Sequence, residues 1–221
     1  MTFSDIVLHF QWGCMIISSI ISLKLIKNVH VPKYMDKFYL YSLAAGLFAF
    51  YNFLQKHFTI LSKGLAGFIN SSLLLFHFIF LSIFIYKLLP KQNSSKKIIF
   101  LFLLFLSIIL FSLFTNELSE PQSMAYAFAN FGLVIFCCIY YLKLFEEMPI
   151  DLINEPSFWI INGIFFCMCA TIPMNALRGY LLDNIPYDFF LAMGAIVSFA
   201  YGIMHLFFIK AYICSVNQPK A

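Results

Sequence analysis

Amide, imidazole and hydroxyl side chains recur inside stretches of this chain that are otherwise apolar. The polar residues that share one level of these stretches are His9, Gln11, Asn52, Asn70, Asn130, Thr171 and Asn175. Their chemistry is hydrogen bonding, and in hydrocarbon such groups must point towards one another or towards a wet cavity. They therefore predict a small-molecule pocket. The alternative is a set of hydrogen bonds between helices, with no ligand at all.

The residues needed for metal, cofactor or catalytic chemistry do not occur in suitable patterns. Among the six cysteines, Cys167 and Cys169 would project about 200° apart on a helix, so they cannot share one metal ion. The sequence has no His-x-x-x-His or Cys-x-x-Cys spacing. Its aspartates lie at the ends of the apolar stretches rather than inside them. We therefore expect no metal, no cofactor and no enzyme activity.

Seven long apolar stretches must position the polar side chains. Hydrophobic residues make up 62% of the sequence and charged residues 11%, against about 25% charged residues in soluble domains. A hydrocarbon core of about 30 Å is crossed by about 20 residues of helix, and a helix satisfies its own backbone there. The expected helices are 4–26, 38–55, 64–86, 97–115, 123–143, 157–177 and 187–211. The predicted fold class is all-α: a polytopic membrane protein with a seven-transmembrane-helix bundle, in one domain spanning 1–221.

The positions of the basic residues indicate how this bundle lies in a membrane. With the N-terminus outside, all but three of the 14 Lys and Arg residues fall on the inner side; the exceptions are Lys56, Lys63 and Arg178. An excess of basic residues marks the cytoplasmic side. We therefore expect an outer N-terminus, a cytoplasmic C-terminus and a multi-pass protein of a cell membrane, with a bacterial inner membrane as the expected location. The lysines are scattered over separate loops, which argues against nucleic-acid binding.

Two features of the predicted helices concern packing and shape. Gly194, Ser198 and Gly202 form a small-residue face on the last helix, which suits close packing within the bundle; a homodimer seam is the alternative. Pro173 removes the amide that would bond to the carbonyl of Cys169, so the sixth helix should bend there. Such a bend would widen the outer end of the bundle.

The start of the sixth predicted helix resembles a stretch found in a family of bacterial membrane sensors. The residues are Glu155-Pro156-Ser157-Phe158-Trp159-Ile160-Ile161-Asn162-Gly163. The resemblance is to the multi-helix membrane region that precedes a histidine kinase, where Pro-x-Phe-Trp-Ile and a following glycine recur. It implies a receptor-like bundle that passes an outside or membrane signal inward. Residues 215–221 are too few for a kinase domain, so the output is expected to go to a separate protein.

These features predict a receptor-like or accessory sensory membrane protein. A small ligand or lipid would bind at the polar level near the outer leaflet and change the tilt of the sixth helix about Pro173. The inner loops would then present a changed surface to a cytoplasmic or membrane signalling partner, while the helices contact the lipid bilayer. Two alternatives stay open. One is a small-molecule transporter, for which the inner half offers only Asn162 and His205 as polar candidates; the other is a scaffold without a ligand.

Overall fold

Seven α-helices and one short 3₁₀ turn account for nearly all of the described chain in the computed structural model. The described residues are 2–25, 35, 37–58, 63–89, 95–115, 123–147 and 152–217. The elements are α1 (Phe3–Leu25), α2 (Phe38–Phe58), α3 (Lys63–Leu88), α4 (Ser95–Thr115), α5 (Ser123–Glu147), η1 (Leu152–Asn154), α6 (Pro156–Asn184) and α7 (Tyr187–Asn217). The predicted all-α class is confirmed.

Each predicted helix overlaps one observed helix, and the largest differences lie at the carboxyl ends of α6 and α7. These helices continue to Asn184 and Asn217, although the predicted helices end at 177 and 211. A helix bonds to its own backbone, so it can continue beyond the apolar segment. α6 ends before Pro186, because a proline disfavours helical geometry at the preceding residue; Ile185 is extended, with φ −122° and ψ 145°. Most of the predicted inner-loop residues, and residue 26 of the first predicted helix, lie outside the described residues.

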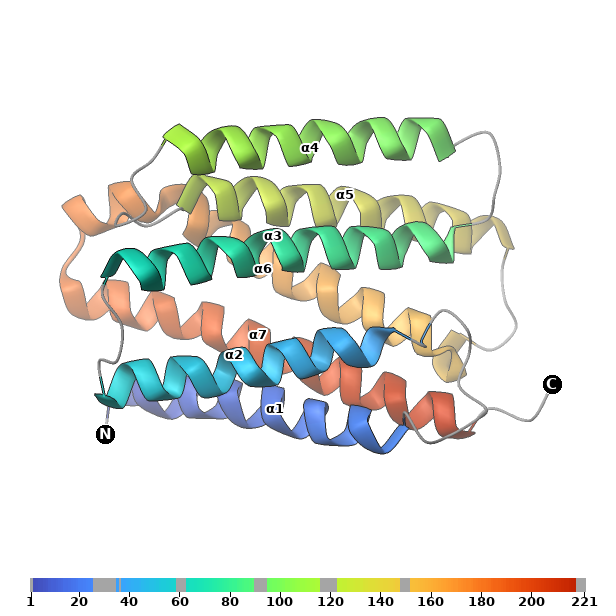
Figure 1. Cartoon of the computed structure of the whole chain (residues 1–221), viewed down its shortest axis with the longest axis horizontal. Helices are drawn as coiled ribbons and strands as arrows, with labels where there is room; N and C mark the ends of the chain where they lie inside the picture. The colour runs from blue at the N-terminus through green and yellow to red at the C-terminus, as the bar shows by residue number, and fades with distance from the viewer. Residues whose placement is uncertain are drawn as a thin grey trace.

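Consecutive helices run in alternating directions, as short connections favour (Figure 1). α1 contacts both α2 and α7, α7 packs on α6, and α6 packs on α5, which also contacts α3 and α4. The N-terminus and the C-terminus lie at opposite ends of the bundle (Figure 1). The alternation therefore brings the start of α1 and the last turns of α2 and α6 to the same end.

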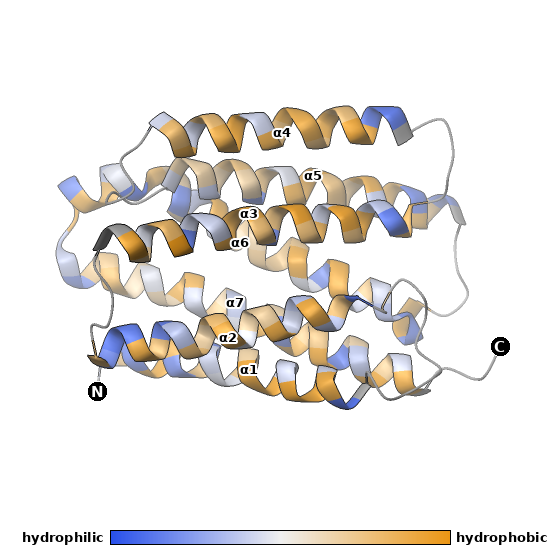
Figure 2. Ribbon diagram, in the orientation of Figure 1, coloured by the Kyte–Doolittle hydropathy of each residue, from blue (hydrophilic) through white to orange (hydrophobic). Residues whose placement is uncertain are grey.

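The outer surface of the bundle is apolar. Phe111, Phe114 and Leu142 are 71%, 85% and 66% exposed, and contiguous surfaces of this kind are unfavourable in water. Figure 2 shows apolar residues along the middle of the helices and most hydrophilic residues towards the two ends of the bundle. Six helices of the described chain, all except α2, are long and apolar enough to cross a bilayer. The chain is therefore a multi-pass membrane protein.

α2 differs from the other helices in its composition. It is long enough to cross a bilayer, but it lacks a segment as apolar as those of the six. The residues that lower its apolarity are Tyr39, Tyr41, Ser42, Tyr51, Asn52, Gln55 and Lys56. Several of them face other helices or cavities, as described below. The assignment of α2 as a seventh membrane span stays a prediction.

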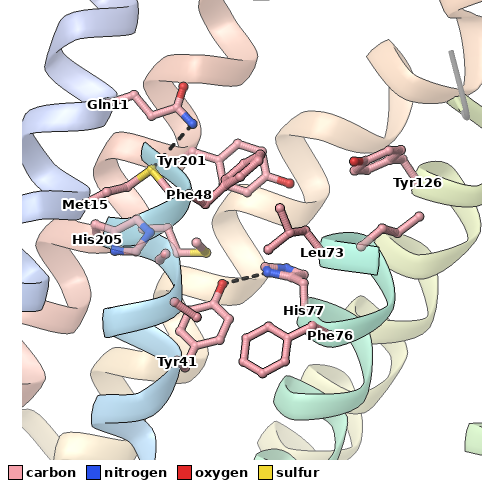
Figure 3. A pocket seen from close by; sticks show the side chains of 14 residues that line it. Gln11, Met15, Tyr41, Phe48, Leu73, Phe76, His77, Tyr126, Tyr201 and His205 are labelled. Carbon is pink, nitrogen blue, oxygen red and sulfur yellow. Dashed lines mark hydrogen bonds between the residues drawn. The ribbon is translucent and has the colours of Figure 1, made fainter. Parts of the chain in front are cut away.

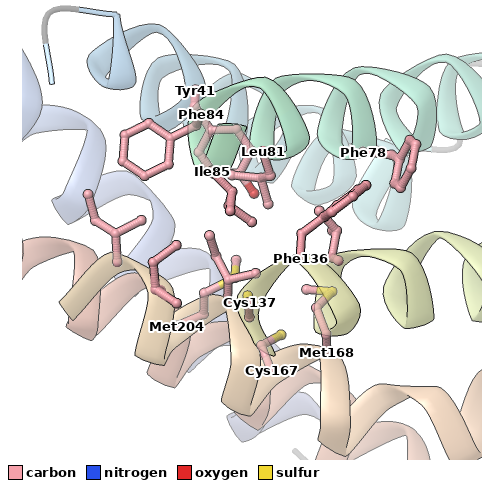
Figure 4. Close-up of a cluster of buried hydrophobic side chains, with 14 of the residues drawn as sticks. Tyr41, Phe78, Leu81, Phe84, Ile85, Phe136, Cys137, Cys167, Met168 and Met204 are labelled. Atoms are coloured by element: carbon pink, nitrogen blue, oxygen red, sulfur yellow. The ribbon is translucent and has the colours of Figure 1, made fainter. Parts of the chain in front are cut away.

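Aromatic, aliphatic and sulfur-containing side chains fill the space between α3, α5, α6 and α7 (Figure 4). Phe78, Phe136, Met168 and Met204 are each at most 2% exposed. Between helices in lipid, such packing stabilises through dispersion contacts rather than through removal of apolar surface from water. Close approach of the helices is therefore the main requirement of this core.

Small residues permit that close approach. A Cβ atom added at Gly163 of α6 would lie 2.8 Å from Cβ of Phe207 and 3.1 Å from the carbonyl oxygen of Met204 on α7. At Gly202 of α7 an added Cβ would lie 2.8 Å from Cδ1 of Phe10 on α1. Gly202 is therefore used for packing within the chain. The predicted homodimer through Gly194, Ser198 and Gly202 stays a prediction. Gly202 packs against Phe10 of the same chain, so it is not available for contact with a second copy.

α6 contains two prolines with different effects. Pro156 occupies the first turn, where its missing N–H costs no helical hydrogen bond. Trp159 in the same turn donates its indole N–H to the carbonyl of Ile153, at 2.7 Å, and so fixes the start of α6. Pro173 lies inside α6, which continues through it. The carbonyl of Cys169 thereby lacks its helical donor.

Candidate functional site

A cavity of about 170 Å³, here called the central cavity, lies between α1, α2, α3, α5 and α7 (Figure 3). Its polar lining residues are Gln11, Tyr41, His77, Tyr126, Tyr201 and His205. Its apolar lining residues are Met15, Ala44, Ala45, Phe48, Leu73, Leu74, Phe76 and Met204. A mainly apolar cavity with a few polar groups is the usual form of a small-molecule site.

His77 places a hydrogen-bond donor at the wall of the central cavity. Its Nδ1 lies 2.6 Å from the hydroxyl oxygen of Tyr41 (Figure 3). The Tyr41 hydroxyl has no second partner among the described residues, which favours donation from its O–H to Nδ1. The ring proton of His77 then lies on Nε2, which is buried and has no hydrogen-bond partner within the described ranges. A buried polar atom without a partner is uncommon in folded proteins.

His205 is held on the α7 side of the same cavity. Its Nδ1 lies 2.9 Å from Oγ of Ser18 on α1, and the residue is 1% exposed. The ring also packs edge-on against Phe208, with the ring centroids 5.2 Å apart. The two cavity histidines are therefore fixed by hydrogen bonds to neighbouring helices, His77 to α2 and His205 to α1.

A polar pocket of about 590 Å³, here called the polar mouth, lies at the end of the bundle where α1 begins. Its lining residues are Leu8, Gln11, Trp12, Asn52, Gln55, Lys56 and Arg178. The Lys56 ammonium pairs with the Asp5 carboxylate at 2.5 Å and lies 6.0 Å from the centre of the Trp12 ring. Gln11 lines both the polar mouth and the central cavity. The two spaces are therefore neighbours that share one amide.

A third space, here called the lateral groove, lies between α2 and α3 and measures about 550 Å³. It shares Ala44, Phe48, Leu73 and Phe76 with the central cavity. The hydroxyl of Tyr51, which also lines this groove, is buried without a hydrogen-bond partner in the described part of the chain. The central cavity is thus bordered by a groove on the side of the bundle and by a polar mouth at its end.

The seven residues predicted for the pocket do not form one site. Gln11 and Asn52 line the polar mouth. Asn130 donates its amide N–H to Oγ1 of Thr171 at 2.7 Å, deep between α5 and α6. Three other predicted residues line neither the central cavity nor the polar mouth. They are His9, Asn70 and Asn175.

Each of these three residues has its own surroundings. His9 stacks on His57 of α2, with the ring centroids 6.4 Å apart, and meets Trp12 edge-on. The backbone carbonyl of Asn70, rather than its amide, accepts a hydrogen bond from the hydroxyl of Tyr126 at 3.2 Å. Asn175 is half-buried in the carboxyl-terminal half of α6. Only the Asn130–Thr171 pair takes the form of the predicted interhelical hydrogen bond.

Sequence reasoning did not place the tyrosines of the central cavity or His77 in a pocket, and it considered His205 only as a polar candidate for a transporter. Tyr41, Tyr126 and Tyr201 belong to a chain with 12 tyrosines and 29 phenylalanines, so their positions carry no distinguishing pattern. His77 does lie four residues after Leu73 on the face of α3 that also lines the cavity. That spacing could have predicted that Leu73 and His77 share one face of α3, but not that a cavity lies beside this face.

Neither a protein-family model, a curated protein nor a solved structure matches this chain. The resemblance of Glu155–Gly163 to the membrane region of sensor kinases therefore stays a prediction. Among the described residues, no three His, Cys, Asp or Glu side chains cluster in a way that could hold a metal ion. The geometry of the cavity, mouth and groove is what bears on function.

Proposed function

We propose that this protein is a receptor-like membrane protein that binds a small lipophilic molecule in the central cavity and signals to a separate partner. The observation that carries this proposal is the combination of an apolar lining with a few polar side chains, among them His77, whose buried Nε2 has no hydrogen-bond partner among the described residues. A lipophilic molecule would fill the apolar space, with its polar group towards the polar residues of the lining. The lateral groove offers such a molecule a route from the bilayer.

The side of the cavity away from the polar mouth is closed by aromatic rings. Phe38 packs on Tyr41, on Phe84 and on Phe208, with ring centroids 5.7, 4.7 and 5.1 Å apart. Phe38 itself is fully buried. A transporter would need a path through this side, so the closed arrangement favours a receptor-like role over transport.

Helix α7 is the element through which a ligand could act on the rest of the bundle. Met204 lines the central cavity, and its carbonyl oxygen approaches Gly163 of α6 closely. A ligand that shifts α7 would therefore press directly on α6, which contains Pro173. A change in the tilt of α6 would then reach η1, which α6 contacts at the other end of the bundle. This is the proposed step from binding to a changed partner surface.

Filling the central cavity should abolish binding. In Ala45→Phe the added ring occupies the cavity, because Ala45 is a lining residue. We expect octan-1-ol or a monocyclic aromatic alcohol to raise the melting temperature of the purified wild-type protein. At a hundredfold excess over Kd, the ligand stabilises the folded state by about 2.7 kcal/mol. The melting temperature of the variant should not change. Ala192→Phe places the same ring on an exposed position of α7 and is the matched control. The proposal fails if no such compound shifts the wild type, or if Ala45→Phe responds equally.

We further propose that the N-terminus and the polar mouth face outside. The support is the distribution of basic residues: Lys24, Lys87, Lys96 and Lys143 all lie near the end of the bundle opposite the mouth, as the inner side requires. With thiols introduced singly, Asn184→Cys should react with a membrane-impermeant maleimide on whole cells, and Lys96→Cys should react only after the cells are opened. The wild type measures the background from its own cysteines. The reverse pattern would invert the proposed orientation.

A further inference from the structure

We propose that the ligand is a short anionic amphiphile, whose carboxylate or phosphate group binds in the polar mouth and whose apolar chain reaches past Gln11 into the central cavity. This inference rests on the proposed function and names the class of ligand. It follows from the charges at the mouth, the shared lining residue and the size of the cavity.

Arg178 supplies the charge. It lines the polar mouth, lies 6.0 Å from the centre of the Phe190 ring, and makes no ion pair with any described residue. A guanidinium group binds carboxylate and phosphate oxygens through paired N–H donors. The amide of Asn52, which also makes no hydrogen bond to a described residue, lines the same pocket. Together they offer several N–H donors around one positive charge.

Lys56 is the other cation of the polar mouth, and it already pairs with the nearby carboxylate. Its ammonium group is already paired with Asp5 at 2.5 Å. Asp5 is in turn held by the backbone N–H and the hydroxyl of Thr2, at 3.0 and 2.9 Å. One carboxylate therefore balances one of the two cations that line the mouth, and the charge of Arg178 remains. An anion is the ligand that this excess favours.

The length of the apolar part follows from the central cavity. Its volume of about 170 Å³ is close to that of an engineered apolar cavity of about 150 Å³ that binds benzene. It therefore takes about six carbon atoms, and the Gln11 amide marks the boundary between the apolar and polar spaces. Octanoate and octyl phosphate have an anionic group at one end and alkyl chains one or two carbons longer than this, which leaves those carbons to pass Gln11. Octan-1-ol is the uncharged match.

The test measures binding of these three compounds to the purified full chain in nanodiscs, with empty nanodiscs as the partition control. Trp159→Phe leaves Trp12, at the polar mouth, as the remaining tryptophan, so its fluorescence reports binding there. We expect octanoate or octyl phosphate to bind at least tenfold more tightly than octan-1-ol. The tighter of the two anions assigns the head group as a carboxylate or a phosphate. Acetate and inorganic phosphate, which lack the chain, should bind much more weakly.

Removal of the Arg178 charge should act on the anions alone. Arg178→Gln and Arg178→Glu are expected to weaken octanoate binding about ten- to hundredfold, the effect of losing a charged hydrogen-bond pair, and to leave octan-1-ol binding unchanged. Lys210→Gln removes an exposed cation at the other end of the bundle and should change neither. The melting temperatures of both Arg178 variants check folding.

Two results would overturn the inference, and they separate it from the proposed function. If octan-1-ol binds as tightly as both anions, or if neither Arg178 variant changes their affinity, the anionic head group is wrong while a lipophilic ligand still stands. If none of the three compounds binds the wild type, the head group and the cavity-binding proposal both fail. Loss of all binding in Ala45→Phe, with selective loss of anion binding in the Arg178 variants, supports both.

Discussion

Replacing Gly163 with leucine should destabilise the protein more than any other single substitution proposed for its helices. Even a Cβ atom at this position would lie 2.8 Å from Cβ of Phe207 and 3.1 Å from the carbonyl oxygen of Met204. One of these atoms belongs to the backbone of α7, so a rotamer change cannot relieve the contact. Overpacking of a core costs about 1–3 kcal/mol, and the bulk of leucine should exceed that range by forcing α6 and α7 apart. The measurement is the melting temperature in nanodiscs together with the yield of folded protein.

Gly194→Leu on α7 is the matched control. Nothing lies within 4 Å of a Cβ atom at that position. Glycine has a lower helix propensity than alanine by about 0.8–1 kcal/mol, and leucine ranks just below alanine. The control should therefore be neutral or slightly stabilising. Gly163→Ala should fall between the two. Equal melting temperatures for Gly163→Leu and Gly194→Leu would show that α6 and α7 do not approach as closely as described.

The helices of this protein could be predicted because the bilayer imposes a length and an apolar composition on each of them. The prediction 123–143 falls inside α5 (Ser123–Glu147), for example, and its start is the same residue. The carboxyl end of α6 could not be placed from apolarity alone, because helix geometry continues into polar sequence. Ile185-Pro186, a local backbone rule rather than a membrane rule, decides where it ends.

The site was harder to predict because depth in the membrane does not determine rotation about the helix axis. Asn52 and Asn130 were placed at one level, yet Asn52 faces the polar mouth and Asn130 faces Thr171 of α6. The central cavity depends instead on where small side chains leave space. On α2, Ala44 and Ala45 leave this space. A run of small residues looks the same in the sequence whether a neighbouring side chain fills the space beside it or not.

The charges at the polar mouth show a similar limit. Lys56 and Arg178 were identified from the sequence as basic residues of the outer side, which is a statement about topology. Both line the polar mouth, so the fold brings residues of α2 and α6 that are 122 positions apart in the sequence to one end of the bundle. Pairing of Lys56 with Asp5 of α1 then leaves Arg178 as the cation without an ion pair among the described residues. Only the tertiary arrangement distinguishes the two cations.

Thr171→Val should destabilise the protein more than Asn130→Leu, although both remove the same hydrogen bond. Asn130 and Thr171 are fully buried, and the amide N–H of Asn130 donates to Oγ1 of Thr171 at 2.7 Å. In Thr171→Val the amide stays buried with its donor unpaired, and its Oδ1 already lacks a partner among the described residues. An unsatisfied buried group costs about 1–3 kcal/mol. In Asn130→Leu both unpaired atoms disappear, and Oγ1 of Thr171 keeps its bond to the carbonyl of Met168 at 3.2 Å.

The double variant completes this comparison and also tests whether the pair belongs to the ligand site. Asn130→Leu with Thr171→Val should be close in stability to Asn130→Leu alone, because no unpaired polar atom of the pair remains. Unfolding in detergent by heat or by sodium dodecyl sulfate measures the four proteins, and the coupling energy is then expected to equal the cost of Thr171→Val alone, about 1–3 kcal/mol. Binding of octan-1-ol should be unchanged in Asn130→Leu, since Asn130 does not line the central cavity. Loss of binding at unchanged stability would instead support the prediction from the sequence that Asn130 belongs to the ligand site.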